Sequence, residues 1–224
     1  TSKGKKVIVI EKNISEEINI HKKELENIGV EVYLDTPFEY KVFSSFINEI
    51  EYVIISPGIS IENKTIIELK LHGVKVIGEV NLAWNNLRNL KWVGITGTNG
   101  KTTVTDLLSH ILCKNNINAP SAGNIGTPLC KYAHSPNNFK IDWLIAELSS
   151  FQLEIGNKIK PKIGIWTTFS SDHLDRHKTI ENYFKIKNNL LKNSEYRIYN
   201  YDDNLLKKSY NFLSKGIWIS SKSN

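Results

Sequence analysis

The residue types with the clearest chemistry lie in one short glycine-rich segment. It reads Gly97-Thr98-Asn99-Gly100-Lys101-Thr102-Thr103 and lies between an apolar run at 91–95 and a helical pattern that extends to about residue 115. Glycines allow backbone N–H groups to converge on an anion, and the amino end of a helix adds partial positive charge. Lys101 can reach the β- and γ-phosphates of a nucleotide, and the Thr102 hydroxyl can bind Mg²⁺. We predict a nucleotide phosphate loop, in which Ile95 replaces the first glycine of the strict pattern.

A second polar segment follows the apolar run at 163–167. It reads Ser171-Asp172-His173-Leu174-Asp175-Arg176-His177. Because no Cys accompanies these residues, zinc is a poor fit, and oxygen ligands beside a phosphate loop favour Mg²⁺. A histidine in a polar loop is usually solvated, so the segment alone leaves a structural role open. Lys187 lies farther along in a helical pattern, where a lysine is normally a solvated cation.

Polar residues also follow the apolar run at 141–146, which we predict to be a buried strand. The chain continues Glu147-Leu148-Ser149-Ser150-Phe151-Gln152-Leu153-Glu154. Ligands of open α/β sheets lie at the carboxyl ends of such strands, so Glu147 is a candidate ligand residue. The alternative is a strand-end turn with a solvated Glu147. We expect Phe151 and Leu153 to hold this turn on the core, and Glu154 to be solvated.

Another glycine turn reads Ala122-Gly123-Asn124-Ile125-Gly126-Thr127-Pro128. Asn124 is flanked by two glycines, so its backbone and its amide can approach a ligand closely. An ordinary surface loop explains the same residues equally well.

Short β-branched runs alternate with amphipathic stretches, which is typical of α/β folds with parallel sheets and right-handed crossovers. In the first part we predict strands at 6–10, 30–34, 52–55 and 74–77, and helices at 15–28, 43–50 and 63–72. In the second part we predict strands at 91–95, 141–146, 162–167, 196–199 and 216–219, with helices after the phosphate loop and at 180–192. We place a domain boundary at 88–91.

The composition is that of a globular protein. The 224 residues are 40% hydrophobic and 23% charged, which allows a packed core. The net charge of +6 comes from scattered lysines, so charge gives no sign of nucleic-acid binding. No apolar run approaches the roughly 20 residues of a membrane span. Cys113 and Cys130 lack the spacing of a disulfide framework or a metal site, so we expect reduced thiols in a cytoplasmic protein.

Together these motifs resemble the Mur ligases, the ATP-dependent amide-forming enzymes of peptidoglycan synthesis. The phosphate loop is shared with folylpolyglutamate synthetases and identifies only the superfamily. The segments "GNIGTP", "ELSSFQLE" and "DHLDRH…Y…K" are narrower, and they resemble the members that join D-glutamate to UDP-N-acetylmuramoyl-L-alanine. The resemblance is dense over 92–190 and thin over 1–88.

The resemblance implies a fold and a set of partners. The fold would be a Rossmann-like UDP-substrate domain at 1–90, followed by an incomplete P-loop NTPase-like domain for ATP at 91–224. The partners would be the small molecules UDP-N-acetylmuramoyl-L-alanine, D-glutamate and ATP, with no nucleic acid and no membrane. We expect a monomer in the cytoplasm.

The resemblance also implies roles for residues. Lys101 would hold the ATP phosphates, while Thr102 and Glu147 would bind a first Mg²⁺. His173 and Lys187 would bind a second Mg²⁺ and complete the catalytic set; in the family this lysine is N-carbamylated, which gives a carboxylate-like anion. The sugar–peptide part of the UDP substrate would contact Asn124, Ser149 and Gln152. The uridine side would contact Asp35 and Thr36, and the diphosphate side would contact Gly58.

The chain departs from the family pattern in several places. No glycine follows the first predicted strand, where the chain reads Glu11-Lys12-Asn13-Ile14-Ser15. Thr168 replaces a frequent Asn, and Lys178 replaces a glycine. Family members are about twice as long and have three domains, so we expect a fragment that is inactive by itself.

Other functions remain open on the sequence alone. A ligase that adds glutamate to folate would share the phosphate loop, but the residues after Glu147 argue against it. A non-catalytic nucleotide-binding module would bind ATP without substrate-dependent ADP release. A GTPase-type switch is disfavoured because we find no guanine-reading motif.

Overall fold

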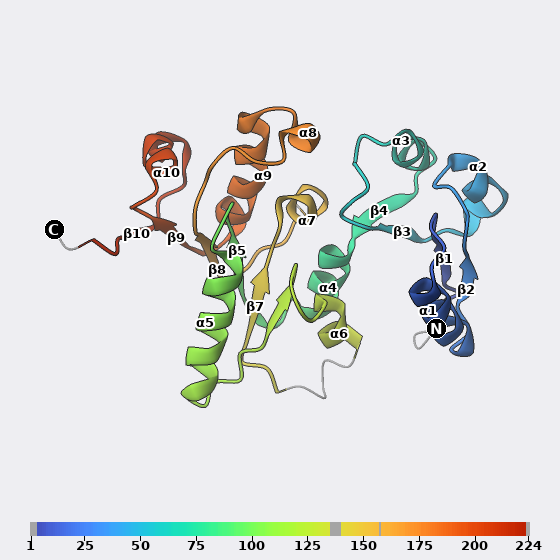
Figure 1. The fold of residues 1–224 in the computed structure, drawn as a ribbon, viewed down its shortest axis with the longest axis horizontal. Helices are drawn as coiled ribbons and strands as arrows, with labels where there is room; N and C mark the ends of the chain where they lie inside the picture. Colours follow the sequence, from blue (N-terminus) through green and yellow to red (C-terminus); the bar gives the residue numbers. More distant parts are fainter. Residues whose placement is uncertain (1–3, 135–139, 157, 223–224) are drawn as a thin grey trace. The chain divides into compact units, whose positions relative to one another are not determined.

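The computed structural model describes residues 4–134, 140–156 and 158–222. Its contacts divide the chain into two compact units. The first unit comprises Thr1–Val53 and Glu62–Val76, and the second comprises Ile54–Ile61 and Ile77–Asn224. The fold is α/β, as predicted (Figure 1).

The second unit is built on a six-stranded parallel sheet with the strand order β10-β9-β8-β5-β7-β6. The strands are β5 (Lys91–Thr96), β6 (Ser121–Gly123), β7 (Trp143–Glu147), β8 (Ile163–Trp166), β9 (Tyr196–Asn200) and β10 (Ile217–Ile219). The helices are α4 (Glu79–Leu87), α5 (Lys101–Lys114), α6 (Leu129–His134), α7 (Ser150–Ile155), α8 (Leu174–His177), α9 (Ile180–Asn193) and α10 (Asn204–Lys208), with a 3-10 helix at Tyr210–Phe212. Since the strands are parallel, their carboxyl ends meet at one edge of the sheet.

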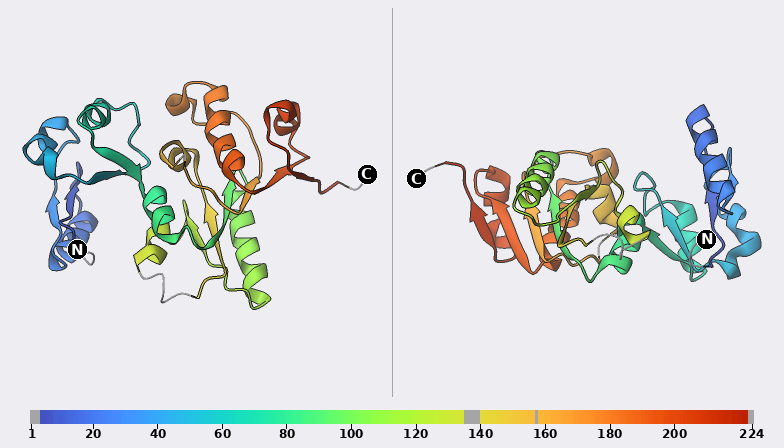
Figure 2. Two further views of the ribbon diagram at one scale, coloured as in Figure 1. Left: turned by 180° about the vertical axis from the view of Figure 1, so that it is seen from behind. Right: turned by 90° about the horizontal axis from the view of Figure 1, so that it is seen from below.

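Strand side chains alternate between the two faces of this sheet, as the period of a strand requires. On one face, residues of β5 and β7 pack against α5; they are Val93, Ile95 and Ile145. On the other face, residues of β5, β7 and β8 share a core with α4, α6, α7 and α9; they are Trp92, Leu144, Ala146 and Trp166. The sheet is therefore covered by helices on both sides (Figures 1 and 2).

Two glycines let α9 lie close to the centre of the sheet. Gly94 of β5 and Gly164 of β8 are partners in the strand register. A Cβ at residue 94 would lie 3.0 Å from the Leu190 side chain, and a Cβ at residue 164 would meet the side chains of Leu191 and Ser194. This close packing places Lys187, which is also on α9, against the end of β5.

The first unit is smaller and has short strands. The parallel pair β1 (Ile8–Ile10) and β2 (Glu31–Tyr33) is followed along the chain by the pair β3 (Tyr52–Ile55) and β4 (Lys75–Gly78), and the unit boundary falls within β3 and β4. The helices are α1 (Glu16–Asn27), α2 (Tyr40–Phe43), the 3-10 helix η1 (Ser44–Glu49) and α3 (Lys64–Leu71). One buried hydrophobic cluster of this unit contains Phe43, Leu69 and Val74.

Most predicted elements are present within a few residues of the expected positions. The four predicted N-terminal strands form two separate pairs among the described residues. The helix predicted at 43–50 is α2 followed by η1, with a kink at Phe46. Among the described residues, five α-helices of the second unit were not predicted; they are α4, α6, α7, α8 and α10. Cys113 and Cys130 are free thiols, as expected.

Candidate functional site

The glycine-rich segment forms a tight loop between β5 and α5. Gly100 has a φ of 77° at the start of α5, a conformation that favours glycine. At residue 97 a Cβ would overlap the Thr167 hydroxyl, so only glycine fits there. The residues after β8 hold the loop from outside, because Thr98 N–H donates to Thr168 O at 2.8 Å and Thr167 Oγ1 donates to Asn99 O at 2.6 Å. The loop is thus fixed at the carboxyl ends of β5 and β8.

Two lysines meet at this loop. Lys101 Nζ donates to the carbonyls of Gly97 and Thr98, at 3.1 and 2.9 Å. Lys187 Nζ donates to the same Gly97 carbonyl at 2.8 Å, and its side chain is buried. Burial, and to a smaller extent the charge of Lys101, lower the pKa of Lys187 to about 7, although Asp172 acts in the opposite direction. The structure therefore corrects the reading of Lys187 as a solvated cation.

Glu147 lies at the end of β7, next to the phosphate loop. Its side chain is 1% exposed and accepts hydrogen bonds from Thr102 Oγ1 at 2.8 Å and Asn124 Nδ2 at 2.9 Å. Asn124 N–H also donates to Glu147 O at 2.9 Å, and a Cβ at residue 123 would overlap that carbonyl. Three predicted site residues from separate segments thus meet at one carboxylate.

The donor set at this point fits Mg²⁺. Mg²⁺ takes hard oxygen ligands and is commonly bound by one or two carboxylates together with phosphate oxygens and water. The Glu147 carboxylate and the Thr102 hydroxyl lie 2.8 Å apart at the start of α5. Within the described part of the chain, no group of three or more His, Cys, Asp or Glu side chains is gathered closely enough to hold a metal. A cation at this site would therefore depend on phosphate oxygens for its remaining ligands.

Among the described residues, His173 contacts side chains other than Glu147. It has a φ of 51°, its Nε2 is 3.5 Å from Asp172 Oδ2, and its ring contacts Phe151. Tyr183 adjoins both His173, with ring centroids 6.3 Å apart, and Lys187, whose Nζ lies 4.7 Å from the Tyr183 ring. The contacts of the described residues thus bring the two predicted ligands of a second Mg²⁺ to one tyrosine and not to each other.

Ser149 and Gln152 form a helix cap. Ser149 N–H donates to Gln152 Oε1 at 3.0 Å, and Gln152 N–H donates to Ser149 Oγ at 3.2 Å, which together form a capping box at the start of α7. The expected turn after Glu147 is therefore a helix. Leu153 is buried, as expected. The substrate contacts of Ser149 and Gln152 remain a prediction.

The remaining predicted substrate residues lie in two different units. In the first unit, Asp35 has a φ of 50°, and Thr36 N–H donates to Glu11 O at 3.1 Å, which links the ends of β1 and β2. Gly58 belongs to the second unit. Its carbonyl accepts a hydrogen bond from Arg176 Nη1 at 3.1 Å.

The sequence did not lead us to predict an ionic cluster that Glu154, Arg176 and His177 form. Glu154, expected to be solvated, is only 11% exposed and pairs with Arg176. His177 is buried, its Nε2 lies 2.9 Å from Ser150 Oγ, and burial lowers its pKa, an effect that Glu154 opposes. The sequence signal that could have indicated this cluster is a pair of opposite charges in two distant motifs, with Glu154 in one and Arg176 in the other.

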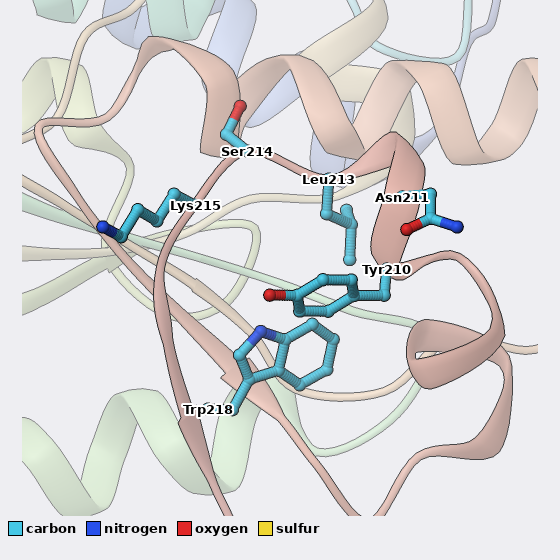
Figure 3. A pocket seen from close by; sticks show the side chains of 6 residues that line it. All are labelled: Tyr210, Asn211, Leu213, Ser214, Lys215 and Trp218. Atoms are coloured by element: carbon cyan, nitrogen blue, oxygen red, sulfur yellow. The ribbon is translucent and has the colours of Figure 1, made fainter.

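A pocket of about 380 Å³ lies beside β10 and away from these motifs in the sequence. Figure 3 shows the six residues that line it, which are Tyr210, Asn211, Leu213, Ser214, Lys215 and Trp218. None of them is a predicted phosphate, metal or substrate residue.

None of the helices in the described ranges is long and apolar enough to cross a membrane.

Comparison with known proteins finds relatives that share one name. A protein of Prochlorococcus marinus strain MIT 9515 named UDP-N-acetylmuramoylalanine--D-glutamate ligase is 62% identical over 99% of this chain and 47% of that protein. A protein of the same name from strain NATL2A is 45% identical over 98% of this chain and 48% of that protein. The chain spans about half the length of these relatives.

Solved structures share the fold. A UDP-N-acetylmuramate:L-alanyl-gamma-D-glutamyl-meso-diaminopimelate ligase from Neisseria meningitides has a TM-score of 0.64 at 16% identity, over 98% of this chain and 71% of that chain. MurF ligase from Thermotoga maritima in complex with ADP has a TM-score of 0.51 at 20% identity, over 79% of this chain and 49% of that chain.

A family comparison covers the site itself. The Mur ligase middle domain matches residues 95–223, which include the phosphate loop, Glu147, His173 and Lys187. This match spans more than half of the chain and confirms the resemblance drawn from the motifs. The chain belongs to the Mur ligase family.

Proposed function

We propose that this chain is the UDP-substrate- and ATP-binding part of a ligase that joins D-glutamate to UDP-N-acetylmuramoyl-L-alanine. The observation that carries the proposal is the meeting of Thr102, Asn124 and Glu147 at one buried carboxylate beside the phosphate loop. It links the ATP motif directly to the two narrower motifs. The names of the relatives supply the substrate class.

The first proposed step is transfer of the γ-phosphate of ATP to the L-alanine carboxylate of the UDP substrate. A carboxylate and a triphosphate repel each other, so positive groups must bring them together. The Lys101 ammonium and the N–H groups of the loop that starts α5 supply positive charge at a fixed place. The product of this step is an acyl phosphate and ADP.

Mur ligases are ATP-dependent, and Mg²⁺ would supply further charge neutralisation at the phosphates. We propose that Thr102 and Glu147 hold one ion. For a second ion, we propose His173 and an N-carbamylated Lys187. A carbamate forms on a neutral amine, and the lowered pKa of Lys187 provides that form near neutral pH.

In the second proposed step, the amine of D-glutamate attacks the acyl carbon. The tetrahedral intermediate collapses to an amide and releases phosphate. We propose Asn124, Ser149 and Gln152 as contacts of the sugar–peptide part, with Gly58 on the diphosphate side and Asp35 and Thr36 on the uridine side. The D-glutamate site would lie in the part of the relatives that this chain does not span.

We also propose the division into a UDP-substrate domain at 1–90 and an ATP-binding domain at 91–224. The protein would act as a monomer in the cytoplasm on small-molecule substrates.

The test uses the longest polypeptide encoded in frame with this sequence. ADP release is measured with ATP and Mg²⁺ while UDP-N-acetylmuramoyl-L-alanine and D-glutamate are omitted in turn. We expect release only with both, and we expect L-glutamate and folate acceptors to fail. Replacement Lys101→Ala should lower turnover by about 100-fold or more, as loss of a charge-stabilising group does.

Two results would contradict the proposal. ATP binding without any substrate-dependent ADP release would favour a non-catalytic nucleotide-binding module. Unchanged turnover of the Lys101→Ala variant would remove the phosphate loop from the mechanism. Exposed Lys114 at the other end of α5 offers a matched control, since Lys114→Ala keeps the loop intact.

A further inference from the structure

The side chain of Arg176 donates hydrogen bonds to the backbone of another segment. It lies on α8, three residues after His173, and only 12% of its side chain is exposed. Nη1 donates to the carbonyl of Gly58 at 3.1 Å, and Nη2 donates to the carbonyl of Ile59 at 3.0 Å. A guanidinium presents its N–H groups in a rigid plane, so these two carbonyls are held in a fixed relation.

The two carbonyls belong to a tight turn. The turn reads Ser56-Pro57-Gly58-Ile59, and Ile59 N–H closes it by donating to Ser56 O at 3.0 Å. Pro57 fixes one φ of the turn, while Gly58 adds conformational freedom at the next position. The bonds from Arg176 offset that freedom, because they fix the second half of the turn.

Glu154 fixes the other side of the guanidinium. Its Oε2 accepts hydrogen bonds from both Nε, at 3.1 Å, and Nη2 of Arg176. Its Oε1 lies 3.7 Å from Nδ1 of the buried His177. The Phe151 ring lies 5.3 Å from the guanidinium carbon. The charge of Arg176 is therefore balanced and its orientation set by α7, which follows Glu147.

We propose that Arg176 is a positioning residue that holds the Ser56–Ile59 turn in place for the diphosphate side of the UDP substrate. The proposal rests on the proposed function, which assigns the substrate contact to Gly58. Arg176 acts through the turn and contacts no reacting atom. A turn that is ordered before the substrate arrives lowers the entropy cost of binding. The residue thus joins three segments that the sequence presents separately, at 56–59, 147–154 and 171–177.

The kinetic test replaces Arg176 in the full-length protein. We expect Arg176→Ala to raise the KM for the UDP substrate by about 10-fold or more, since hydrogen bonds from a charged group are lost. The kcat and the KM for ATP should change by less than about twofold, because Arg176 does not contact the phosphate loop. Arg176→Lys should give a smaller rise in KM, since an ammonium cannot span both carbonyls and Glu154.

Arg197 provides a matched control. It also donates to backbone carbonyls, those of Leu191 at 2.8 Å and Lys215 at 3.3 Å, and it lies at β9. Replacement Arg197→Ala removes the same kind of contact from another part of the second unit. We expect the KM for the UDP substrate to stay unchanged in this variant.

Amide hydrogen exchange provides a readout that does not depend on the reaction. Exchange at Ile59, whose N–H closes the turn by donating to Ser56 O, should be faster in Arg176→Ala than in the wild type and in Arg197→Ala. Unchanged exchange at this amide would overturn the positioning role whatever the activity. Two results with faster exchange would show that the turn does not serve the UDP substrate. One is an unchanged KM for the UDP substrate, and the other is an equal rise in the KM values for the UDP substrate and for ATP.

The failure of the proposed function gives a different result. If the wild-type protein does not use UDP-N-acetylmuramoyl-L-alanine, the proposed substrate is wrong. Faster amide hydrogen exchange in the turn of Arg176→Ala would then still show that Arg176 orders the turn.

Discussion

The side-chain amines of Lys101 and Lys187 both donate to the carbonyl oxygen of Gly97, at 3.1 and 2.8 Å. Lys101 begins α5, while Lys187 reaches the loop from α9. Burial is the main cause that lowers the pKa of Lys187 to about 7, and the nearby Lys101 adds to it. One of the two amines is therefore readily neutral near physiological pH, although both face the same acceptor.

The first prediction concerns the chemistry of this neutral amine. Replacement Lys187→Ala in the full-length enzyme should lower turnover by about 100-fold or more, because a metal-binding carbamate would be lost. Short carboxylic acids such as acetate should restore part of the activity, since they can supply the missing anion. The measurement is ADP release with and without added acid.

Lys185 provides the control for this prediction, because it is exposed on the same helix. Lys185→Ala should retain activity and should not respond to added acid. Full activity of Lys187→Ala without any acid would exclude the carbamate.

The second prediction concerns stability and pH. In the folded chain the pKa of Lys187 lies at about 7, below the value of 10.5 for a free lysine. Between these values the unfolded chain binds more protons, so this group makes the folded state more stable as pH rises. The penalty from burying the charge is full below pH 7 and disappears above about pH 10.5.

Replacement Lys187→Met removes this penalty at every pH. In CO₂-free buffer, we expect Lys187→Met to be more stable than the wild type by the largest margin below pH 7. The margin should shrink as pH rises toward 10, as measured by urea unfolding of both proteins. A margin that stays constant from pH 6 to pH 10 would show that Lys187 keeps an ordinary pKa.

The third prediction concerns the carboxylate beside the phosphate loop. Glu147→Gln keeps the shape of the side chain but removes its charge, so it should weaken the binding of Mg²⁺–ATP by about 10-fold or more. Binding of ATP without Mg²⁺ should change much less. Calorimetric titration with and without Mg²⁺ makes this comparison.

Asp106 provides the control, since it is an exposed carboxylate on α5. Asp106→Asn should leave both titrations unchanged. Equal weakening of ATP binding in the presence and absence of Mg²⁺ by Glu147→Gln would argue against a cation at this carboxylate.

The fourth prediction concerns the 224-residue chain by itself. We expect it to bind ATP through the phosphate loop but to form no amide product with UDP-N-acetylmuramoyl-L-alanine and D-glutamate. Product analysis by mass spectrometry decides the point. Robust ligation by this chain would show that all residues needed for the reaction lie within it.

Local patterns predicted much of the fold. The β5 strand, the phosphate loop and α5 could be predicted because the period of apolar residues changes at two glycines. The helix α7 was taken for a turn, since its six residues are too few for a clear helical period. Its capping box, formed by Ser149 and Gln152, was the local signal for that helix.

Contacts between distant segments could not be predicted in the same way. Glu154 was expected to be solvated because a single charged residue in a polar segment usually is. Its partner Arg176 on α8 is 22 positions away, and the two segments meet because α7 and α8 both pack against α9. The buried position of Lys187 likewise depends on Gly94 and Gly164, which let α9 approach the sheet.

The most direct measurement of the proposed reaction follows an oxygen atom. The full-length enzyme is supplied with UDP-N-acetylmuramoyl-L-alanine labelled with ¹⁸O in the alanine carboxylate, together with ATP, Mg²⁺ and D-glutamate. If the carboxylate attacks the γ-phosphate and the amine then expels phosphate, the released inorganic phosphate must carry the label. Unlabelled phosphate, or label in AMP, would contradict an acyl phosphate formed at this phosphate loop.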